Sequence, residues 1–447
     1  MEAFDAIAYI NTPRWQNVSL GLERTRSLMA KLGNPQNNLK FVHVAGTNGK
    51  GSTCVYVANI LQAAGYVTGM FTSPYIEKFE ERIQVNGQCI PLNDLTSATL
   101  AVKEKAEEVE RETGEHPTEF ELMTAVALVH FARRNCDIVV LEVGLGGRLD
   151  STNIIEPPEV CAIARMGLDH TALLGNTLAE VAGEKAGIIK PGSAVVSYPQ
   201  EESAAAVITQ AAAAVGASVR EPDFSRLSAG STSVVPYENG CELLMRTFSY
   251  DGLDNLQTSL LGEYQPGNAA FAIEIVRALV GRGWAITPEH IRAGIKAACW
   301  PGRFEVFPHK PGTPWIVVDG GHNPQGIQAL RRTCEDVFPG KAPWVVLSLL
   351  ADKDYDSMTQ TLADYAAGFV AMTPPNLRAL PASELAQVLR QKCAACGRTD
   401  VPIAEASSFE DARDQVLRLA AANDLIVVSG SLYSVASAKQ AFAVARK

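Results

Sequence analysis

The stretch HVAGTNGKGST, residues 43–53, combines residue types that bind phosphate. It holds three glycines and one lysine, and it ends on two hydroxyl residues. The usual phosphate-loop pattern G-x-x-x-x-G-K-[ST], aligned on Gly49 and Lys50, requires glycine at Val44 and Ser or Thr at Gly51. Both positions fail, so the residue types indicate nucleotide binding with an altered spacing.

A strand and a helix must position this loop. Residues 39–46 read as a buried strand and residues 52–65 as a helix, so the loop's N–H groups and the helix N-terminus converge where phosphate binds. Lys50 would reach the β and γ oxygens, and the hydroxyls would meet phosphate or Mg²⁺. An ordinary tight turn with a surface lysine is the alternative. The predicted nucleotide-binding residues are Gly46, Thr47, Asn48, Gly49, Lys50, Gly51, Ser52 and Thr53.

A second chemical signal is a glutamate inside an apolar run. Glu142 lies near the C-terminal end of the strand-like residues 136–143, where a buried carboxylate needs a partner. A metal ion in the crevice beyond the strand ends would supply one. The glycines that follow allow close approach of a ligand, so Arg148 and Asp150 could contact it. A salt-bridged structural glutamate is the alternative.

The elements around these residues alternate between short β-branched runs and amphipathic helices, which predicts an α/β fold. We expect two domains, residues 1–297 and 298–447, divided where ACWPG interrupts a helix. The first is a P-loop-type parallel sheet with a small antiparallel β addition formed by residues 217–262. The second is a Rossmann-like α/β domain.

Composition excludes several classes of protein. The net charge of −10 disfavours a nucleic-acid surface, and no apolar run is long enough to span a membrane. The N-terminus does not resemble a signal peptide, and nine scattered cysteines fit a reduced, cytoplasmic protein. Cys393 and Cys396 form a C-x-x-C with no second pair, so helix-end packing is favoured over a metal or redox role.

Several motifs carry a family resemblance. GTNGKGST resembles the loop of folylpolyglutamate synthases and dihydrofolate synthases, relatives of the Mur ligases, whose own loop reads GTNGKT. Gly51 is characteristic of the folate branch. Residues 72–87 resemble S-P-H-L-x-x-F-x-E-R-I, with Tyr75 in place of histidine, and residues 169–190 resemble D-H-x-x-x-L-G followed by E-K-A-G-I-I-K.

The resemblance implies a magnesium site and a catalytic set. Ser73, Glu142 and His170 would bind Mg²⁺, together with a carbamylated Lys185, whose cationic form would be electrostatically wrong beside a metal. Lys50, Glu142, His170 and Lys185 would form the catalytic set. A surface or phosphate-binding Lys185 stays open as an alternative.

The same resemblance implies further nucleotide and substrate contacts. LLGEYQPGNAAFA supplies Asn268, with Tyr264 where the family commonly has histidine. WPGRFEV and VVDGGHNPQG extend the nucleotide contacts into the second domain, so that ATP would bridge the two domains. These contacts are Arg303, Asp319, His322 and Asn323. TEFELMTAVAL resembles the helix beside the pteridine or pteroate site, which makes Phe120 and Glu121 substrate residues along with Arg148 and Asp150.

The expected activity is ATP- and Mg²⁺-dependent addition of L-glutamate to a folate or dihydropteroate carboxylate, through an acyl phosphate. This describes a folylpolyglutamate synthase that is also a dihydrofolate synthase. One alternative is a Mur-type ligase adding an amino acid to a peptidoglycan precursor, although such enzymes carry a whole domain before the loop, where this chain has only 45 residues. The other is a non-catalytic nucleotide-binding relative. We expect a monomer whose partners are small molecules, with neither nucleic acid nor membrane.

Overall fold

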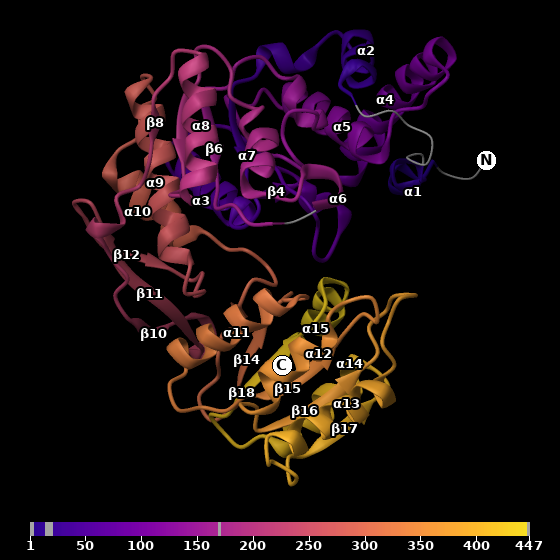
Figure 1. The fold of residues 1–447 in the computed structure, drawn as a ribbon, viewed down its shortest axis with the longest axis vertical. Coiled ribbons are helices and arrows are strands. Elements are labelled where there is room, and N and C mark those ends of the chain that lie inside the picture. The colour runs from indigo at the N-terminus through magenta and orange to yellow at the C-terminus, as the bar shows by residue number, and fades with distance from the viewer. Residues whose placement is uncertain (1–3, 14–20, 169–170, 445–447) are drawn as a thin grey trace. The chain divides into compact units, whose positions relative to one another are not determined.

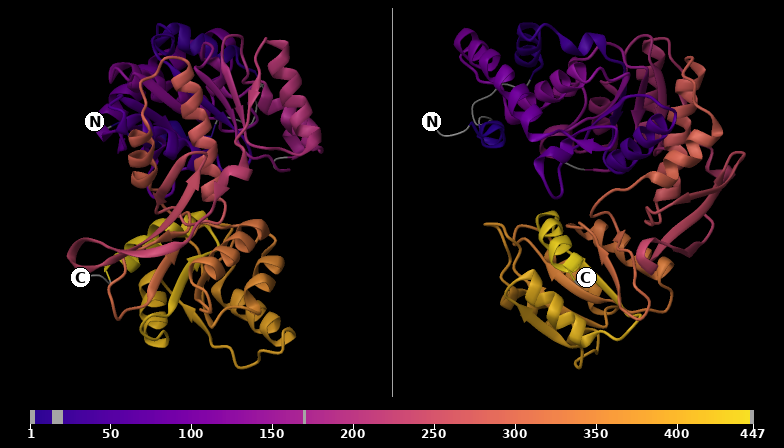
Figure 2. Two further views of the ribbon diagram at one scale, coloured as in Figure 1. Left: turned by 90° about the vertical axis from the view of Figure 1, so that its left-hand side faces the viewer. Right: turned by 180° about the vertical axis from the view of Figure 1, so that it is seen from behind.

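The computed structural model describes residues 4–13, 21–168 and 171–444. The chain divides into two compact units. The first contains residues 1–227 and 267–297, and the second contains residues 228–266 and 298–447. The chain therefore leaves the first unit, returns for one helical segment, and leaves again at residue 298. Each unit is built around its own sheet (Figures 1 and 2).

The first unit contains an eight-stranded sheet. Its central strands are parallel, and an antiparallel hairpin forms one edge. In spatial order the strands are β4 (Gln88–Cys89), β3 (Ile83–Val85), β2 (Thr68–Phe71), β5 (Ile138–Glu142), β1 (Phe41–Ala45), β6 (Val160–Ile163), β7 (Ala194–Ser197) and β8 (Val219–Arg220). Every residue of β1 and β5 is buried, as expected for parallel strands covered on both faces.

Helices cover both faces of this sheet. They are α1 (Ala6–Asn11), α2 (Glu23–Lys31), α3 (Lys50–Ala63), α4 (Leu92–Thr113), α5 (Glu119–Arg133), α6 (Thr171–Leu174), α7 (Leu178–Ala186), α8 (Glu202–Ala214), α9 (Gln265–Gly281) and α10 (Pro288–Ala297). Helix α3 packs on β1, β2 and β5 and also against α10. The segment that returns from the second unit thus completes the helical layer over α3 (Figure 1).

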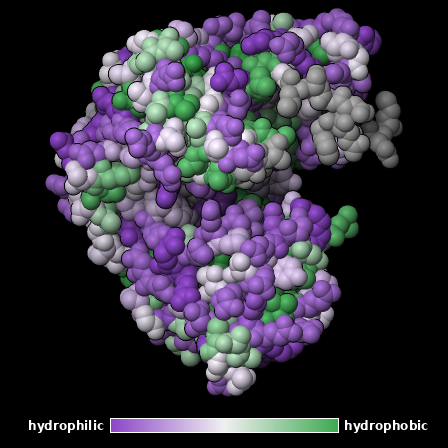
Figure 3. All heavy atoms as spheres, in the orientation of Figure 1, coloured by the Kyte–Doolittle hydropathy of each residue, from purple (hydrophilic) through white to green (hydrophobic). Residues whose placement is uncertain are grey.

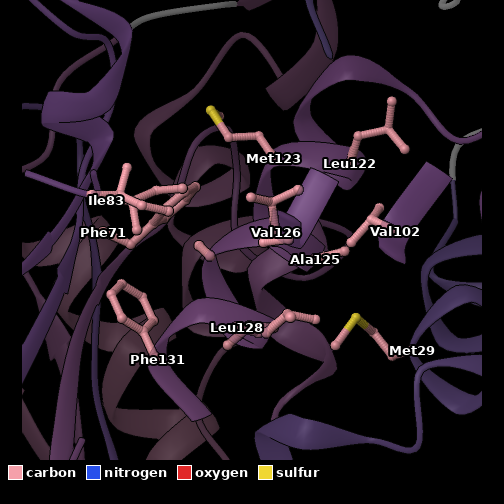
Figure 4. Close-up of a cluster of buried hydrophobic side chains, with 14 of the residues drawn as sticks. Met29, Phe71, Ile83, Val102, Leu122, Met123, Ala125, Val126, Leu128 and Phe131 are labelled. Carbon is pink, nitrogen blue, oxygen red and sulfur yellow. The ribbon is translucent and has the colours of Figure 1, made fainter. Parts of the chain in front are cut away.

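The two faces of β5 separate two environments. Leu141 belongs to an apolar cluster built with residues of α4 and α5, including Val102, Leu122 and Phe131 (Figure 4). The next residue, Glu142, points to the opposite face, because side chains alternate along a strand. That face is the one covered by α3, which begins at the predicted phosphate loop.

The second unit contains a six-stranded sheet, parallel except for its edge strand β13. In spatial order its strands are β13 (Glu305–Val306), β14 (Trp315–Val318), β18 (Leu425–Ser429), β15 (Trp344–Ser348), β16 (Gly368–Met372) and β17 (Ile403–Ala406). Its helices are α11 (Pro324–Val337), α12 (Tyr355–Ala363), α13 (Ala382–Ala395), α14 (Phe409–Leu419) and α15 (Leu432–Val444). Hydrophilic residues cover most of its face seen in Figure 3, with hydrophobic residues scattered among them.

An antiparallel meander also belongs to the second unit. It consists of β10 (Thr232–Pro236), β11 (Glu242–Tyr250) and β12 (Leu253–Thr258), with β9 (Leu227–Ser228) pairing with β11. The sequence placed this region beside the first sheet. The structure differs because Leu244 lies in the apolar core of the second unit and Arg246 forms an ion pair with Asp336 of α11.

The predicted α/β class is confirmed, with mostly parallel sheets in both units and the additional antiparallel strands. The domain limits at residues 297 and 298 stay a prediction. Among the helices that the structure describes, none is both long and apolar enough to cross a membrane.

Candidate active site

The loop between β1 and α3 has a shape that only glycine permits at two positions. Gly46 and Gly49 have positive φ angles of 147° and 84°. A Cβ atom on Gly46 would lie 2.7 Å from the Ala164 side chain, and one on Gly49 would lie 2.7 Å from Oδ1 of Asn268. The loop is therefore pressed between the end of β6 and helix α9. This contact places the predicted nucleotide residue Asn268 against the loop.

Backbone hydrogen bonds fix the tip of the loop. The N–H groups of Thr47 and Asn48 both donate to the carbonyl of Arg165, at 3.0 and 2.9 Å. The Thr53 hydroxyl donates to the Gly49 carbonyl at 2.8 Å. Because the first N–H groups of a helix have no partner within it, the start of α3 gives this loop its capacity to bind an anion.

A small pocket of about 40 Å³ opens beside the loop. Its lining combines glycine backbone, apolar side chains and two lysines: Gly46, Thr47, Lys50, Val143, Gly144, Leu145, Gly146, Leu174 and Lys185. Lys50 Nζ lies 3.4 Å from the Thr47 carbonyl and 3.9 Å from Oε1 of Glu142. Lys50 and Lys185 both line this pocket, and two cationic side chains at one site suit a phosphate group.

Glu142 ends β5 beside this pocket and is only 3% exposed. Its Oε2 accepts a hydrogen bond from the Ser73 N–H at 3.2 Å. The structure thus brings together Lys50, Ser73 and Glu142, with Lys185 lining the same pocket. His170 lies outside the described residues.

The chemistry of these donors fits Mg²⁺ on one condition. Within the described part of the chain, no cluster of three or more His, Cys, Asp or Glu side chains is placed to hold a metal. Magnesium, however, is usually bound by one or two carboxylates together with substrate phosphates and water. Glu142 and the Ser73 hydroxyl would therefore hold Mg²⁺ only together with a bound phosphate.

The two predicted substrate residues of α5 have different environments. The ring of Phe120 packs over Gly144, where a Cβ atom would lie 2.3 Å from it, and so borders the pocket lining. Glu121 is buried and forms a closed network instead. Its oxygens accept bonds from Arg24 Nε and Nη2 at 2.9 and 3.0 Å, from the Thr25 hydroxyl at 2.9 Å and from the Thr118 N–H at 2.7 Å.

Asp150 and Arg148 follow the glycine-rich segment after β5. Asp150 Oδ2 accepts the Leu145 N–H at 2.8 Å, and Oδ1 accepts the Thr152 N–H at 3.0 Å and the Thr152 hydroxyl at 2.5 Å. Burial raises the pKa of Asp150. Arg148 extends to α7, donating to the Gly183 carbonyl at 3.0 Å. A direct substrate contact for either residue stays a prediction.

Sequence reasoning missed a buried histidine behind Asp150. His43 of β1 is fully buried, and its Nε2 lies 2.9 Å from the Thr152 hydroxyl. Burial, reinforced by the charge of Lys190, lowers the pKa of His43 to about 3. Its position inside an all-apolar strand was a signal that its charge is suppressed.

Arg82 was missed as well. Its guanidinium lies 4.9 Å from the centre of the Tyr75 ring, and among the described residues its buried Nε has no hydrogen-bond partner. Burial lowers the pKa of Arg82, while the charge of Glu142 opposes that shift. Tyr75, which stands where the family pattern has histidine, therefore lies beside a half-buried cation.

The predicted residues of the second unit form their own cluster. Asp319, at the end of β14, accepts the Phe304 N–H through Oδ2 and the Gly321 N–H through Oδ1, both at 2.8 Å. Burial raises its pKa, although those two bonds and the charge of Arg303 oppose the shift. His322 Nδ1 lies 2.9 Å from the Gly320 carbonyl.

Asn323 caps α11 by accepting the Gly326 N–H at 2.7 Å. This bond satisfies one of the open N–H groups at the helix start. The nucleotide roles predicted for Arg303, Asp319, His322 and Asn323 stay predictions.

Known proteins match both units. The family described as the Mur ligase middle domain matches residues 44–276, and the Mur ligase glutamate ligase domain matches residues 302–432. The dihydrofolate synthase/folylpolyglutamate synthase of Bacillus subtilis (strain 168) is 36% identical over 451 residues, covering 98% of each chain.

Solved structures agree with these matches. Folylpolyglutamate synthase of Mycobacterium tuberculosis, crystallised with ADP and AMPPCP, aligns with a TM-score of 0.79 at 29% identity over 95% of each chain. An FPGS–AMPPCP–folate complex aligns with a TM-score of 0.77 at 32% identity over 98% of each chain. The predicted family is confirmed: the chain belongs to the folylpolyglutamate synthase/dihydrofolate synthase family of Mur ligases.

Proposed function

We propose that this protein is an ATP-dependent ligase that adds L-glutamate to the carboxylate of a folate or of dihydropteroate. One observation carries the proposal. In a chain of this family, Lys50 and Lys185 line a pocket at a glycine loop, with the buried Glu142 beside Lys50. A peptidoglycan-directed ligase is disfavoured because relatives that match along nearly their full length are named as folylpolyglutamate or dihydrofolate synthases.

The loop and Lys50 would bind the phosphates of the substrate ATP. Phosphoryl transfer needs mainly positioning and charge neutralisation, which the start of α3 and a lysine ammonium provide. Bound Mg²⁺ would supply further neutralisation, held by Glu142, Ser73 and His170 together with phosphate oxygens. Arg303 and Asp319 are proposed as the nucleotide contacts of the second unit.

The reaction that fits these groups has two steps. An oxygen of the acceptor carboxylate attacks the γ-phosphorus, ADP leaves, and an acyl phosphate forms. The amine of L-glutamate then attacks the acyl carbon, loses a proton, and expels inorganic phosphate. Phe120, which packs over Gly144 beside the phosphate pocket, is proposed to contact the aromatic part of the acceptor.

Lys185 is proposed to be carbamylated in the active enzyme. Lys185 is only 5% exposed and lines the same pocket as Lys50, and a carbamate would exchange a second cation for an anionic metal ligand. Protein loaded with ¹³C-bicarbonate should give a carbamate carbon signal that Lys185→Arg lacks. Identical spectra for the two proteins would remove this assignment.

One pair of assays tests the function. Purified protein is incubated with ATP, Mg²⁺ and L-glutamate, with dihydropteroate in one series and tetrahydrofolate in the other. Phosphate release and incorporation of labelled glutamate are measured together. We expect both signals with at least one acceptor and neither without an acceptor. Absence of both signals in both series would contradict the proposal. A monomeric state is also expected, and light scattering on the eluted protein tests it.

A further inference from the structure

We infer that Glu305 is a positioning residue that fixes the turn carrying Arg303. The inference rests on the proposed function, because it takes Arg303 as a contact to the phosphates of ATP. It adds a residue that never touches nucleotide yet sets where the guanidinium lies. The turn, residues 302–305, directly precedes and enters the edge strand β13 of the second unit.

The backbone of this turn adopts a disfavoured conformation. Phe304 has a φ of 48°, in the left-handed region that bulky residues rarely occupy. Its ring is only 2% exposed and belongs to the apolar core of the second unit. Because the apolar core fixes the ring of Phe304, the unusual backbone conformation sets the orientation of the peptide groups around Arg303. Such a conformation persists only where surrounding contacts hold it.

Glu305 holds one side of the turn. Its Oε2 accepts the Gly302 N–H at 2.9 Å, which closes the turn across Arg303. Its Oε1 lies 2.9 Å from Nζ of Lys439, on α15. The ion pair therefore fixes the orientation of the carboxylate that holds the backbone before Arg303.

The strand end β14 holds the other side. The Gly320 N–H donates to the Gly302 carbonyl at 2.8 Å, and Asp319 Oδ2 accepts the Phe304 N–H at 2.8 Å. Hydrogen bonds thus fix the peptides on both sides of Arg303. Gly302 has no side chain, Phe304 is in the core and Glu305 is ion-paired. Arg303, half-buried, is the side chain that this turn can offer to a ligand.

The test is a double-mutant cycle between Glu305 and Arg303 in the full-length enzyme. Two quantities are measured for each protein: kcat/KM for ATP, and the Kd of AMPPCP by calorimetry without acceptor. Arg303→Ala should lower kcat/KM about 100-fold. Glu305→Ala should lower it roughly tenfold, because the guanidinium is displaced rather than removed. Glu305→Gln, which keeps an acceptor for the Gly302 N–H, should stay within about twofold of wild type.

The decisive result is non-additivity. If Glu305 acts only through Arg303, Glu305→Ala should have no further effect on either quantity in the Arg303→Ala background. If Glu305→Ala only destabilised the fold, it would lower the melting temperature, and its effect on kcat/KM would be the same with and without Arg303. If Glu305→Ala folds poorly, Lys439→Met serves as a second variant, because it removes the ion pair that orients Glu305. It should lower kcat/KM less than Glu305→Ala does, and this loss should also disappear in the Arg303→Ala background. Glu335→Ala is the matched control, because it breaks an exposed ion pair with Arg331 in the same unit.

Two outcomes would overturn the inference. One is the same tenfold loss for Glu305→Ala with and without Arg303. The other is wild-type kcat/KM and Kd for both Glu305→Ala and Lys439→Met. The proposed function fails differently, since a wild-type enzyme without glutamate incorporation would contradict the ligase assignment before any variant is made.

Discussion

Two buried glutamates of the first unit, Glu121 and Glu142, look alike in the sequence but have different surroundings in the structure. Both lie in largely apolar segments, and both were predicted to face a ligand. Glu121 receives four hydrogen bonds of 2.7 to 3.0 Å from Arg24, Thr25 and Thr118. Glu142 meets the Ser73 N–H at 3.2 Å and Lys50 Nζ at 3.9 Å, at the edge of a pocket.

The difference shows that burial does not by itself identify a catalytic carboxylate. A carboxylate offers about four acceptor positions, and the bonds to Glu121 use all of them. Asp150 resembles Glu121, because it caps the turn at Thr152 and holds the Leu145 backbone. We therefore separate a pocket group, Lys50 and Glu142, from a support group, Glu121 and Asp150.

The largest effect should come from the pocket group. Lys50→Ala should lower kcat by about 1,000-fold, because it removes the cation that neutralises charge on the transferred phosphoryl group. The free energy of unfolding in urea should change by less than about 1 kcal/mol, since Lys50 is not a core side chain. Near-wild-type turnover would contradict a catalytic role for Lys50 and the distinction between the pocket group and the support group.

The next effect should appear in stability rather than in chemistry. Glu121→Ala should lower the free energy of unfolding by about 2–4 kcal/mol, because it removes two hydrogen bonds from the buried Arg24, which keeps its ion pair with Glu115. Glu107→Ala is the control. It breaks an exposed pair with Lys103 and should cost under about 1 kcal/mol. Wild-type stability of Glu121→Ala combined with lost ligation would instead support the substrate role predicted from the sequence.

A smaller effect should appear in the pH dependence of stability. The pKa of His43 is lowered from 6.5 to about 3, so below pH 6.5 the unfolded chain binds a proton that the folded chain excludes. Stability should therefore fall as the pH falls, by about 2 kcal/mol between pH 6.5 and pH 5. His43→Gln should lack this part of the slope in urea unfolding measured across that range. Equal slopes for the two proteins would contradict a neutral His43 in the folded chain.

The sequence predicted the pocket group better than the support group. Two local patterns predicted the pocket group. One is the run of glycines with a lysine between a strand and a helix, and the other is a glutamate at the end of an apolar strand. Thr118, three residues before Glu121, forms a local capping box with it, but Arg24 and Thr25 come from 97 and 96 residues away, and no local pattern contains that pairing. The same reason explains why the meander was assigned to the wrong unit. The sequence of short antiparallel strands does not show which apolar core a residue such as Leu244 joins.

The central claim is that the pocket at Lys50 activates a carboxylate by phosphorylation. The direct test uses an acceptor whose reacting carboxylate is labelled with oxygen-18, incubated with the wild-type protein, ATP, Mg²⁺ and L-glutamate. An acyl phosphate must transfer one of the carboxylate oxygens to phosphate, so the released phosphate should carry oxygen-18. Unlabelled phosphate, formed while glutamate is incorporated, would contradict the account.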